Sequence, residues 1–256
     1  MQPDWLRPDW LADPGLSMVG ALMTTRAGGH SAKPWDRMNL GVAVGDDPGT
    51  VADNRRSFAQ AMAASPVFLR QVHGTRVLRL TAAHALPDAP VEAADACFTT
   101  EPGVACVVQV ADCLPVLMAA PQGRAVGAAH AGWRGLASGV LEAAVRSVCE
   151  AAACAPDELR CWLGPCIGPS KFEVGADVLA AFGAGPPTGD GLRFRPGKPG
   201  KWLANLPLLA RDRLQALGVA DISGGDWCTV SDASRFFSFR RDGVTGRMAA
   251  AIWIRR

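Results

Sequence analysis

Two histidines and one cysteine stand at places where an apolar core has no use for their side chains. His73 lies in the polar turn QVHGT between two short apolar runs. Cys113 begins the run CLPVLMAA, and His130 ends the run RAVGAAH just before Ala-Gly-Trp-Arg-Gly. Imidazole nitrogen and thiolate sulfur are ligands that zinc prefers, and three protein ligands leave a fourth position for water or substrate. These residues therefore suggest a metal site of the catalytic type.

Each of the three residues also has a plain structural interpretation. His73 fits equally as a hydrogen-bonded loop histidine, and Cys113 as a small buried residue, because free cysteine is among the most buried residue types. The separations along the chain match no short zinc motif, and neither Cys-x-x-Cys nor His-Glu-x-x-His occurs. Cys166, in a Gly-Pro-Cys-Ile-Gly-Pro turn, lacks the second cysteine of the zinc nucleobase deaminases. The residues alone leave the metal site a hypothesis.

Charged residues beside these positions extend the chemistry. Arg134 carries a planar guanidinium suited to phosphate or carboxylate, and a helix expected after Gly135 would favour an anion at its start. Asp112, directly before Cys113, is a candidate acid/base group or a carboxylate that orients a metal-bound histidine. A structural carboxylate in a turn is the alternative for Asp112. For Arg240 and Arg241 we expect ion pairs with acidic residues in preference to substrate binding.

Short strands and helices must position these residues. Apolar runs predict strands at 16–25, 67–70, 76–80, 95–100, 104–110, 115–120, 124–130 and 160–163. Helical patterns cover 50–64 with Thr50 as N-cap, 136–153, 175–183 and 203–217. Residues 183–201 read as a Gly/Pro-rich loop with one short strand, and 236–254 as a β-hairpin turning at Asp242-Gly243. Strict βαβ alternation is missing, so we expect an α+β fold with mixed or antiparallel sheets.

The composition indicates a folded globular protein. The chain has 256 residues, of which 49% are hydrophobic and 20% charged, with a net charge of +2. That charge, with no dense basic tract, gives no reason to expect a nucleic-acid partner. No run of about 18 apolar residues predicts a membrane span, and the N-terminal stretch lacks a secretory pattern. We therefore expect a cytoplasmic protein with reduced thiols. Residues 1–15 read as a surface arm, and 16–256 as a single domain.

Several long stretches resemble one known family in the same order along the chain. They are TTRAGGHSAKPWDRMNLGVAVGDDPGTVADNRR (24–56), QVHGTRV (71–77), ADACFTT (94–100), VQVADCLPVLM (108–118), AAHAGWRG (128–135), LGPCIGPSKFEVG (163–175) and CTVSDASRFFSFRRDGVTGR (228–247). They look like the YfiH family, also called the laccase-domain or multicopper polyphenol oxidase family, one subgroup of which is known as peptidoglycan editing factor. The resemblance covers nearly the whole chain after residue 16.

The resemblance implies a fold, a cofactor and an activity. The family fold is similar to the cytotoxic-necrotizing-factor catalytic domain, a layered sandwich of mixed β-sheets flanked by helices. Its single zinc ion (Zn2+) per chain would be held by His73, Cys113 and His130. The family acts on purine nucleosides, by phosphorolysis of adenosine, inosine, guanosine and methylthioadenosine and by deamination of adenosine. Arg26 and Asn39 match family positions that line the same pocket, so we expect them, with Asp112, to be catalytic or substrate-binding residues.

Three other functions compete with the nucleoside phosphorylase. A peptidoglycan-precursor hydrolase that removes misincorporated L-serine from UDP-MurNAc would use the same metal site, and the sequence does not exclude it. A copper-dependent polyphenol oxidase needs many more imidazoles than the four histidines present, so copper oxidation is expected only as an adventitious reaction in vitro. A purely structural zinc module would normally have four protein ligands. The sequence indicates no oligomeric state, and monomer and homodimer both stay open.

Overall fold

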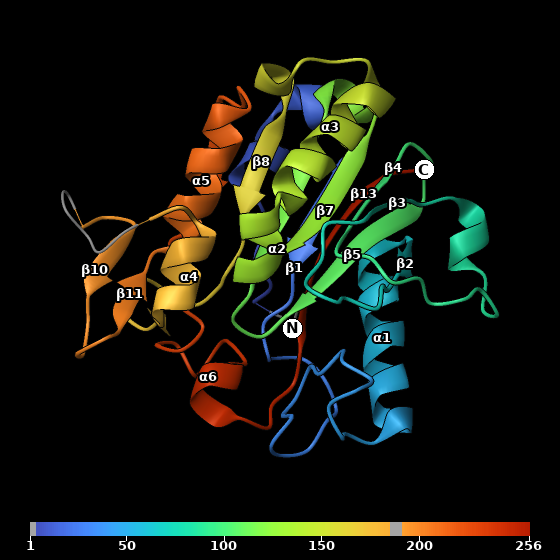
Figure 1. Ribbon diagram of the computed structural model, residues 1–256. Coiled ribbons are helices and arrows are strands. Elements are labelled where there is room, and N and C mark those ends of the chain that lie inside the picture. The colour runs from blue at the N-terminus through green and yellow to red at the C-terminus, as the bar shows by residue number, and fades with distance from the viewer. Residues whose placement is uncertain (1–3, 185–190) are drawn as a thin grey trace.

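Three β-sheets carry the architecture of the computed structural model, which describes residues 4–184 and 191–256 (Figure 1). The six-stranded sheet has, in spatial order, β12 (Asp221–Gly224), β8 (Arg160–Leu163), β6 (Leu114–Ala119), β7 (Val126–Ala131), β4 (Ala96–Thr99) and β3 (Val77–Arg79). The four-stranded sheet has β1 (Val19–Met23), β13 (Met248–Ile254), β5 (Val104–Val110) and β2 (Ser65–Val67). The small sheet has β10 (Phe194–Pro196), β11 (Trp202–Ala204) and β9 (Glu173–Val174).

Among the described residues, six α-helices lie around the sheets. They are α1 (Pro48–Met62), α2 (Trp133–Ser138), α3 (Val140–Ala152), α4 (Ala176–Ala181), α5 (Leu206–Ala216) and α6 (Phe239–Asp242). Parallel and antiparallel pairs occur in both large sheets: β12 runs parallel to β8, for example, while β6 and β7 are antiparallel. The expected α+β class with mixed sheets flanked by helices is thereby confirmed.

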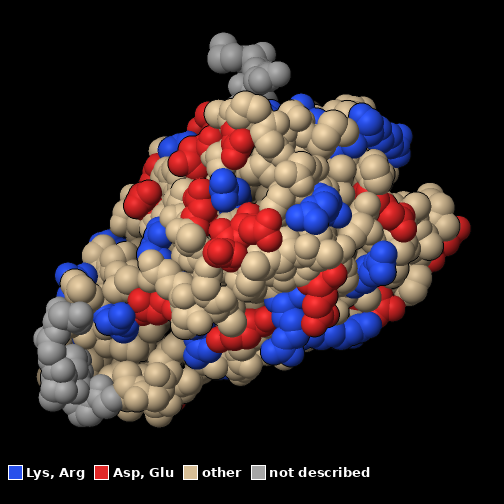
Figure 2. Space-filling model, turned by 90° about the horizontal axis from the view of Figure 1, so that it is seen from above, with Lys and Arg blue, Asp and Glu red and all other residues tan. Residues whose placement is uncertain are grey.

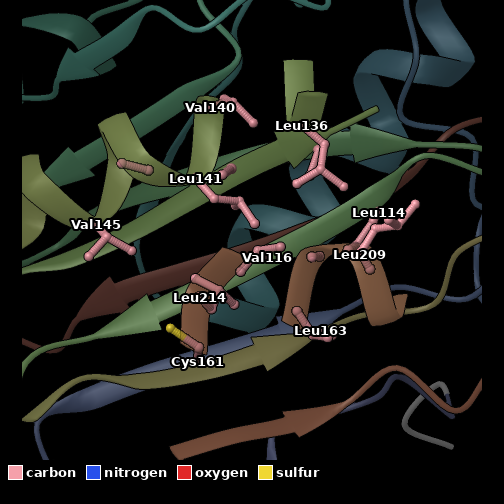
Figure 3. Close-up of a cluster of buried hydrophobic side chains, with 14 of the residues drawn as sticks. Leu114, Val116, Leu136, Val140, Leu141, Val145, Cys161, Leu163, Leu209 and Leu214 are labelled. Atoms are coloured by element: carbon pink, nitrogen blue, oxygen red, sulfur yellow. The ribbon is translucent and has the colours of Figure 1, made fainter. Parts of the chain in front are cut away.

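Successive side chains of the central strands point to opposite faces of each sheet and pack into different hydrophobic cores. On β6, Val116 packs among the side chains of α3 and α5 (Figure 3), whereas the next residue, Leu117, faces the four-stranded sheet. On β5, Val108 points into that space between the sheets and Val107 points the other way, towards Phe58 of α1. Successive side chains of a strand alternate between its faces, so a fully apolar strand here serves two cores. The order of layers is helices, six-stranded sheet, four-stranded sheet, helix.

The surface carries charges of both signs, and part of the N-terminal segment packs against the sheets. On the face shown in Figure 2, acidic and basic side chains are interspersed, as expected for a chain with a net charge of +2. Among the described residues, none of the helices is both long and apolar enough to cross a membrane. Within residues 1–15, expected on the surface, Trp10 is buried and Leu6 forms a bridge with Met23. The division into an arm and a single domain of residues 16–256 stays a prediction.

The helix expected over 136–153 is two helices that meet at Gly139. This glycine has φ of +99°, and its N–H caps α2 by donating to the carbonyls of Gly135 and Leu136. The apolar pattern continues through the junction, so periodicity alone concealed the break. Helix α1 likewise begins earlier than expected, because Asp47 and not Thr50 is its N-cap; the Asp47 carboxylate accepts the Thr50 N–H at 2.7 Å.

The β-hairpin expected over 236–254 is wrong in its first half. Only β13 is a strand, and the residues before it form α6 and a loop. The Ser238 hydroxyl caps α6 by accepting the Arg241 N–H, and the Arg240 N–H donates to Asp112. These backbone donors are therefore not available to a strand ladder. The helix expected over 203–217 also starts later, at Leu206, because Trp202–Ala204 form β11. The loop over 183–201 holds one short strand, β10, as expected, and its residues 185–190 lie outside the described ranges.

The stability of a Gly139→Ala variant tests whether this segment is one continuous helix or two helices, because the two arrangements predict changes in opposite directions. In one continuous helix, Gly139→Ala would stabilise the protein by about 1 kcal/mol through helix propensity. In the left-handed conformation observed, an alanine side chain costs about 1–2 kcal/mol, and we expect the variant to be less stable by that amount. Urea unfolding of the two proteins measures the difference, and a more stable variant would contradict the break.

Candidate metal centre

The six-stranded sheet brings two of the three predicted ligands together through strand register. Cys113 directly precedes β6 and His130 is the penultimate residue of β7, and in this antiparallel pair Leu114 lies opposite Ala131 and Pro115 opposite His130. His73 comes from the loop between β2 and β3. The ligand atoms of the three residues all lie within 4.8 Å of one another, and the Cys113 Sγ is 3.7 Å from His73 Nε2. The structure thus assembles the predicted group from three separate segments.

A buried aspartate that sequence reasoning missed holds the group in place. Asp95 is fully buried directly before β4, and its Oδ1 lies 2.9 Å from Nδ1 of His130. The same carboxylate accepts the backbone N–H groups of Val72, His73 and Gly74 at 2.7 to 3.0 Å. Asp95 therefore orients both histidines, and Nε2 of His130 is left to face the other ligands.

The loop that carries His73 depends on these hydrogen bonds. His73 has φ of +60°, a left-handed conformation that is uncommon for a residue with a side chain. Before it, Gln71 is fixed to the backbone of β5, since its amide donates to the Gln109 carbonyl and accepts the Gln109 N–H. At His73 itself and at its two neighbours, three consecutive N–H groups converge on Asp95. The loop is thus anchored to both large sheets.

A glycine leaves the room that the ligands need. A Cβ built on Gly132 would lie 2.7 Å from Cδ2 of His73 and 3.1 Å from Sγ of Cys113. Any larger residue would displace one of these ligands. Gly132 also serves as N-cap of α2, which begins at Trp133 and not after Gly135 as expected. The sequence signal for this close approach was the run of small residues in AAHAGWRG.

The donor set and its spacing fit a metal ion. Zinc bonds of about 2.3 Å to sulfur and about 2.0 Å to nitrogen, at a tetrahedral angle, separate the two ligand atoms by about 3.5 Å. The observed separation between Cys113 Sγ and His73 Nε2 is 3.7 Å. Two imidazoles and one thiolate are a borderline-soft set that suits zinc or copper. His73 is exposed, so one side of the group is open to solvent.

The lowered pKa values of Cys113 and Asp95 keep negative charge in the group, which favours a cation. Burial alone would raise the pKa of the Cys113 thiol, but the positive charge of His130 and hydrogen bonds from both histidines lower it to about 6. Burial alone would lower the pKa of His130, but the Cys113 thiolate and the bond to Asp95 raise it to about 9. The pKa of Asp95 is lowered despite burial, because His130 and the loop amides donate to its carboxylate.

Among the described residues, Asp112 makes no hydrogen bond to either histidine. Its Oδ1 accepts the Thr229 hydroxyl at 2.5 Å and its Oδ2 accepts the Arg240 N–H at 2.6 Å. The carboxylate that orients a histidine is therefore Asp95. Asp112, with φ of +96°, connects the turn before Cys113 to the segment that leads into α6.

The predicted polar residues around the centre have different surroundings. Arg26 is held by Asp36 and by the Ala233 carbonyl. Asn39 is buried, and its amide is fully used in hydrogen bonds within the chain. Arg134 is exposed and lies over the ring of Trp133, with 4.4 Å from Cζ to the ring centroid.

The two C-terminal arginines and Cys166 can be compared directly with expectation. Arg241 forms the expected ion pair, with Asp242 at 2.7 Å. The Arg240 guanidinium instead donates to the backbone carbonyl of Glu173. Cys166, in the Gly-Pro-Cys-Ile-Gly-Pro turn, is fully buried.

An α+β sandwich with a His-Cys-His group at the ends of the central strands β6 and β7 defines a class of proteins with a candidate metal site, and comparisons with known proteins name the family. The chain belongs to the family described as multi-copper polyphenol oxidoreductase laccase, whose model matches residues 20–255. The resemblance to YfiH proteins is thereby confirmed.

The relatives match along almost the full chain. A protein of Pseudomonas aeruginosa named purine nucleoside phosphorylase is 45% identical over 98% of both chains. The Escherichia coli purine nucleoside phosphorylase YfiH is 45% identical over 96% of this chain and 97% of its own. Among solved structures, a Neisseria meningitidis protein has a TM-score of 0.87 at 41% identity, covering 99% of this chain and 100% of that one. YlmD of Geobacillus stearothermophilus has a TM-score of 0.87 at 34% identity, covering 100% and 98%.

The thiolate gives the first prediction for the centre. In the metal-free protein, Cys113 should carry its negative charge above about pH 6 and lose it as the pH falls through that value. The measurement is thiolate absorbance at 240 nm, taken as the difference between the unaltered protein and Cys113→Ser so that other thiols cancel.

The Asp95→Asn variant is the control for this titration. Without the carboxylate, the pKa of His130 should fall, so its positive charge no longer favours the thiolate and the Cys113 titration should move upward. A midpoint near the ordinary thiol value of about 8.5 in the unaltered, folded protein would contradict the account.

The close approach of Gly132 gives the second prediction. Gly132→Ala should weaken zinc affinity at least tenfold, because the added methyl group displaces His73 or Cys113, and changes beside metal ligands typically cost 10- to 100-fold. Gly49→Ala, in the first turn of α1, is the control and should bind zinc normally. Competition with a chromophoric chelator measures both affinities, and equal values for the two variants would refute the packing argument.

Proposed function

We propose that this protein is a zinc-dependent purine nucleoside phosphorylase. The observation that carries the proposal is the His73–Cys113–His130 group, oriented by Asp95 and open on one side, in a chain 45% identical to proteins named purine nucleoside phosphorylase. The expected substrates are adenosine, inosine, guanosine and methylthioadenosine, with phosphate as the second reactant. Deamination of adenosine is proposed as a second reaction of the same site.

The residues around the group have defined tasks in this proposal. His73, Cys113 and His130 would hold one zinc ion, which supplies Lewis-acid polarisation of a bound substrate oxygen. Asp95 fixes the two histidines and keeps the proton of His130 on Nδ1, because that nitrogen faces the carboxylate. Gly132 keeps the space beside the ligands clear. The reaction then depends on how the chain binds phosphate and nucleoside next to this group.

The predicted polar residues divide into two kinds. Arg134 is exposed, and among the described residues its guanidinium has no hydrogen-bond acceptor, so it stays a candidate phosphate ligand. Arg26 is committed to Asp36 and Ala233, and Asn39 to its own loop and the Arg247 N–H. Both Asp112 oxygens accept hydrogen bonds. We assign positioning roles to Arg26, Asn39 and Asp112.

Multicopper oxidation, suggested by the family description, lacks the additional histidine ligands that it needs. Of the four histidines, only His73 and His130 belong to the group, and among the described residues no second cluster of metal ligands occurs. Multicopper oxidases combine several such clusters. The eight cysteines are free, which suits the reducing cytoplasm we expect for this protein.

The test is turnover of adenosine by zinc-loaded protein, with and without phosphate, with the products separated by chromatography. We expect adenine and ribose 1-phosphate only with phosphate, and inosine in its absence if the site also deaminates. Cys113→Ser should lower both rates at least 100-fold, whereas Cys154→Ser, at the far end of α3, should not.

Two outcomes would contradict the proposal. One is absence of nucleoside turnover by protein that carries a full equivalent of zinc. The other is undiminished turnover by Cys113→Ser. In the first case, release of L-serine from the UDP-MurNAc precursor is the reaction to assay next.

A further inference from the structure

One arginine near the metal centre has unused hydrogen-bond donors. Arg247 is half-buried in the segment between α6 and β13. Its Nη1 donates to the carbonyls of Thr245 and Gly246, both at 3.1 Å. Within the described residues, Nε and Nη2 have no acceptor, and no carboxylate lies within ion-pair distance. Buried arginines are normally paired, so this guanidinium is a candidate for binding an anion that comes from outside the chain.

Strand register places Arg247 beside the metal centre, because the next residue, Met248, pairs with Val110 of β5, three residues before Cys113. Burial lowers the pKa of its guanidinium, and the negative charges of Cys113 and Asp112 partly oppose that effect. Once a divalent cation neutralises the Cys113 thiolate, the metal group and Arg247 present two positive charges to the same space. A doubly charged anion such as phosphate matches that arrangement, and a neutral ligand does not.

The surrounding loop fixes the backbone of Arg247 on two sides. Asn39 Oδ1 accepts the Arg247 N–H at 2.9 Å, and the Leu40 N–H donates to the Arg247 carbonyl at 3.0 Å. The stem packs tightly on a glycine, because a Cβ added to Gly41 would lie 2.7 Å from Cγ of Arg247. The Asn39 amide in turn donates to Asp46 and to the Gly41 carbonyl. Through these hydrogen bonds Asn39 positions Arg247.

An exposed aromatic ring stands next to the same guanidinium. Phe239, the first residue of α6, is 59% exposed, and its ring centroid lies 6.0 Å from Cζ of Arg247. Helix α6 is held at Asp112 through the Arg240 N–H, so the ring is tied to the turn that carries Cys113. An exposed phenyl face beside a cationic site suits a flat heteroaromatic base, because such rings stack favourably.

We propose that Arg247 is the phosphate-binding residue of the metal centre and that Phe239 is the face on which the purine stacks. This inference deepens the proposed function and rests on it. In the reaction, a phosphate oxygen held by Arg247 forms a bond to C1′ of the ribose as the bond from C1′ to N9 breaks. The electron pair of that bond leaves with the purine, which takes a proton from water. Asn39 is a positioning residue that acts through Arg247.

The first measurement needs no turnover. Inorganic phosphate is titrated calorimetrically into zinc-loaded protein and into Arg247→Met, which keeps an unbranched stem on Gly41 but removes the charge. We expect at least tenfold weaker phosphate binding by Arg247→Met, with zinc content unchanged. Arg247→Lys should recover part of the affinity, because the charge returns without the planar fork. Arg79→Met, on the edge strand β3, is the matched control and should bind phosphate normally.

Steady-state kinetics then separates the two roles. Arg247→Met should raise the KM for phosphate at least tenfold and leave the KM for adenosine within about twofold. Phe239→Leu should show the reverse, a raised KM for adenosine with unchanged phosphate binding. Asn39→Ala should resemble a weaker form of Arg247→Met.

The outcomes distinguish this inference from the proposed function. Phosphate binding by Arg247→Met equal to that of the unaltered protein would overturn the role of Arg247, and so would loss of zinc from that variant, which would mark a structural role. If the unaltered protein binds phosphate through Arg247 but turns over no nucleoside, the proposed function fails while the phosphate site stands.

Discussion

A single buried carboxylate holds the metal centre together. Asp95 accepts hydrogen bonds from three consecutive backbone N–H groups of the His73 loop and contacts Nδ1 of His130. Burying an isolated charge is costly, and here four donors compensate for the lost water. Because His73 and His130 lie 57 residues apart in the sequence, no local structure would bring them together. The arrangement of both ligands, and the charge state of Cys113 between them, follows from this one side chain.

The fold supplies the rest of the centre through register and through the C-terminal segment. The pairing of β6 with β7 sets Cys113 near His130, and Gly132 allows the His73 ring to approach. The Asp112 carboxylate accepts hydrogen bonds from Thr229 and Arg240 and so fixes the start of α6. From α6 the chain passes into β13, whose first residue Met248 pairs with Val110, three residues before Cys113, so the metal ligands and Arg247 share one edge of the sandwich. That shared edge is the physical basis for both proposals.

Much of this could be predicted from the sequence, and the exceptions have physical reasons. Local setting singled out His73, Cys113 and His130 only as a hypothesis, because each residue also had a structural interpretation, and the family resemblance made them a ligand set. Asp95 was missed, since an aspartate in ADACFTT is the ordinary start of a strand and its four partners come from other segments. The break at Gly139 lies inside an unbroken apolar pattern. The α6 segment was wrongly predicted as a strand, because its helical turn depends on the Arg240 N–H bond to Asp112, a contact across 128 residues.

The central claim is that His73, Cys113 and His130 together bind one zinc ion, and X-ray absorption spectroscopy at the zinc edge tests it most directly. The account predicts one equivalent of zinc with a single sulfur at about 2.3 Å and nitrogen or oxygen ligands at about 2.0–2.1 Å. In Cys113→Ser the sulfur contribution should disappear, while Cys154→Ser should leave the spectrum unchanged. Two or more sulfur ligands, or a spectrum that Cys113→Ser does not alter, would contradict it.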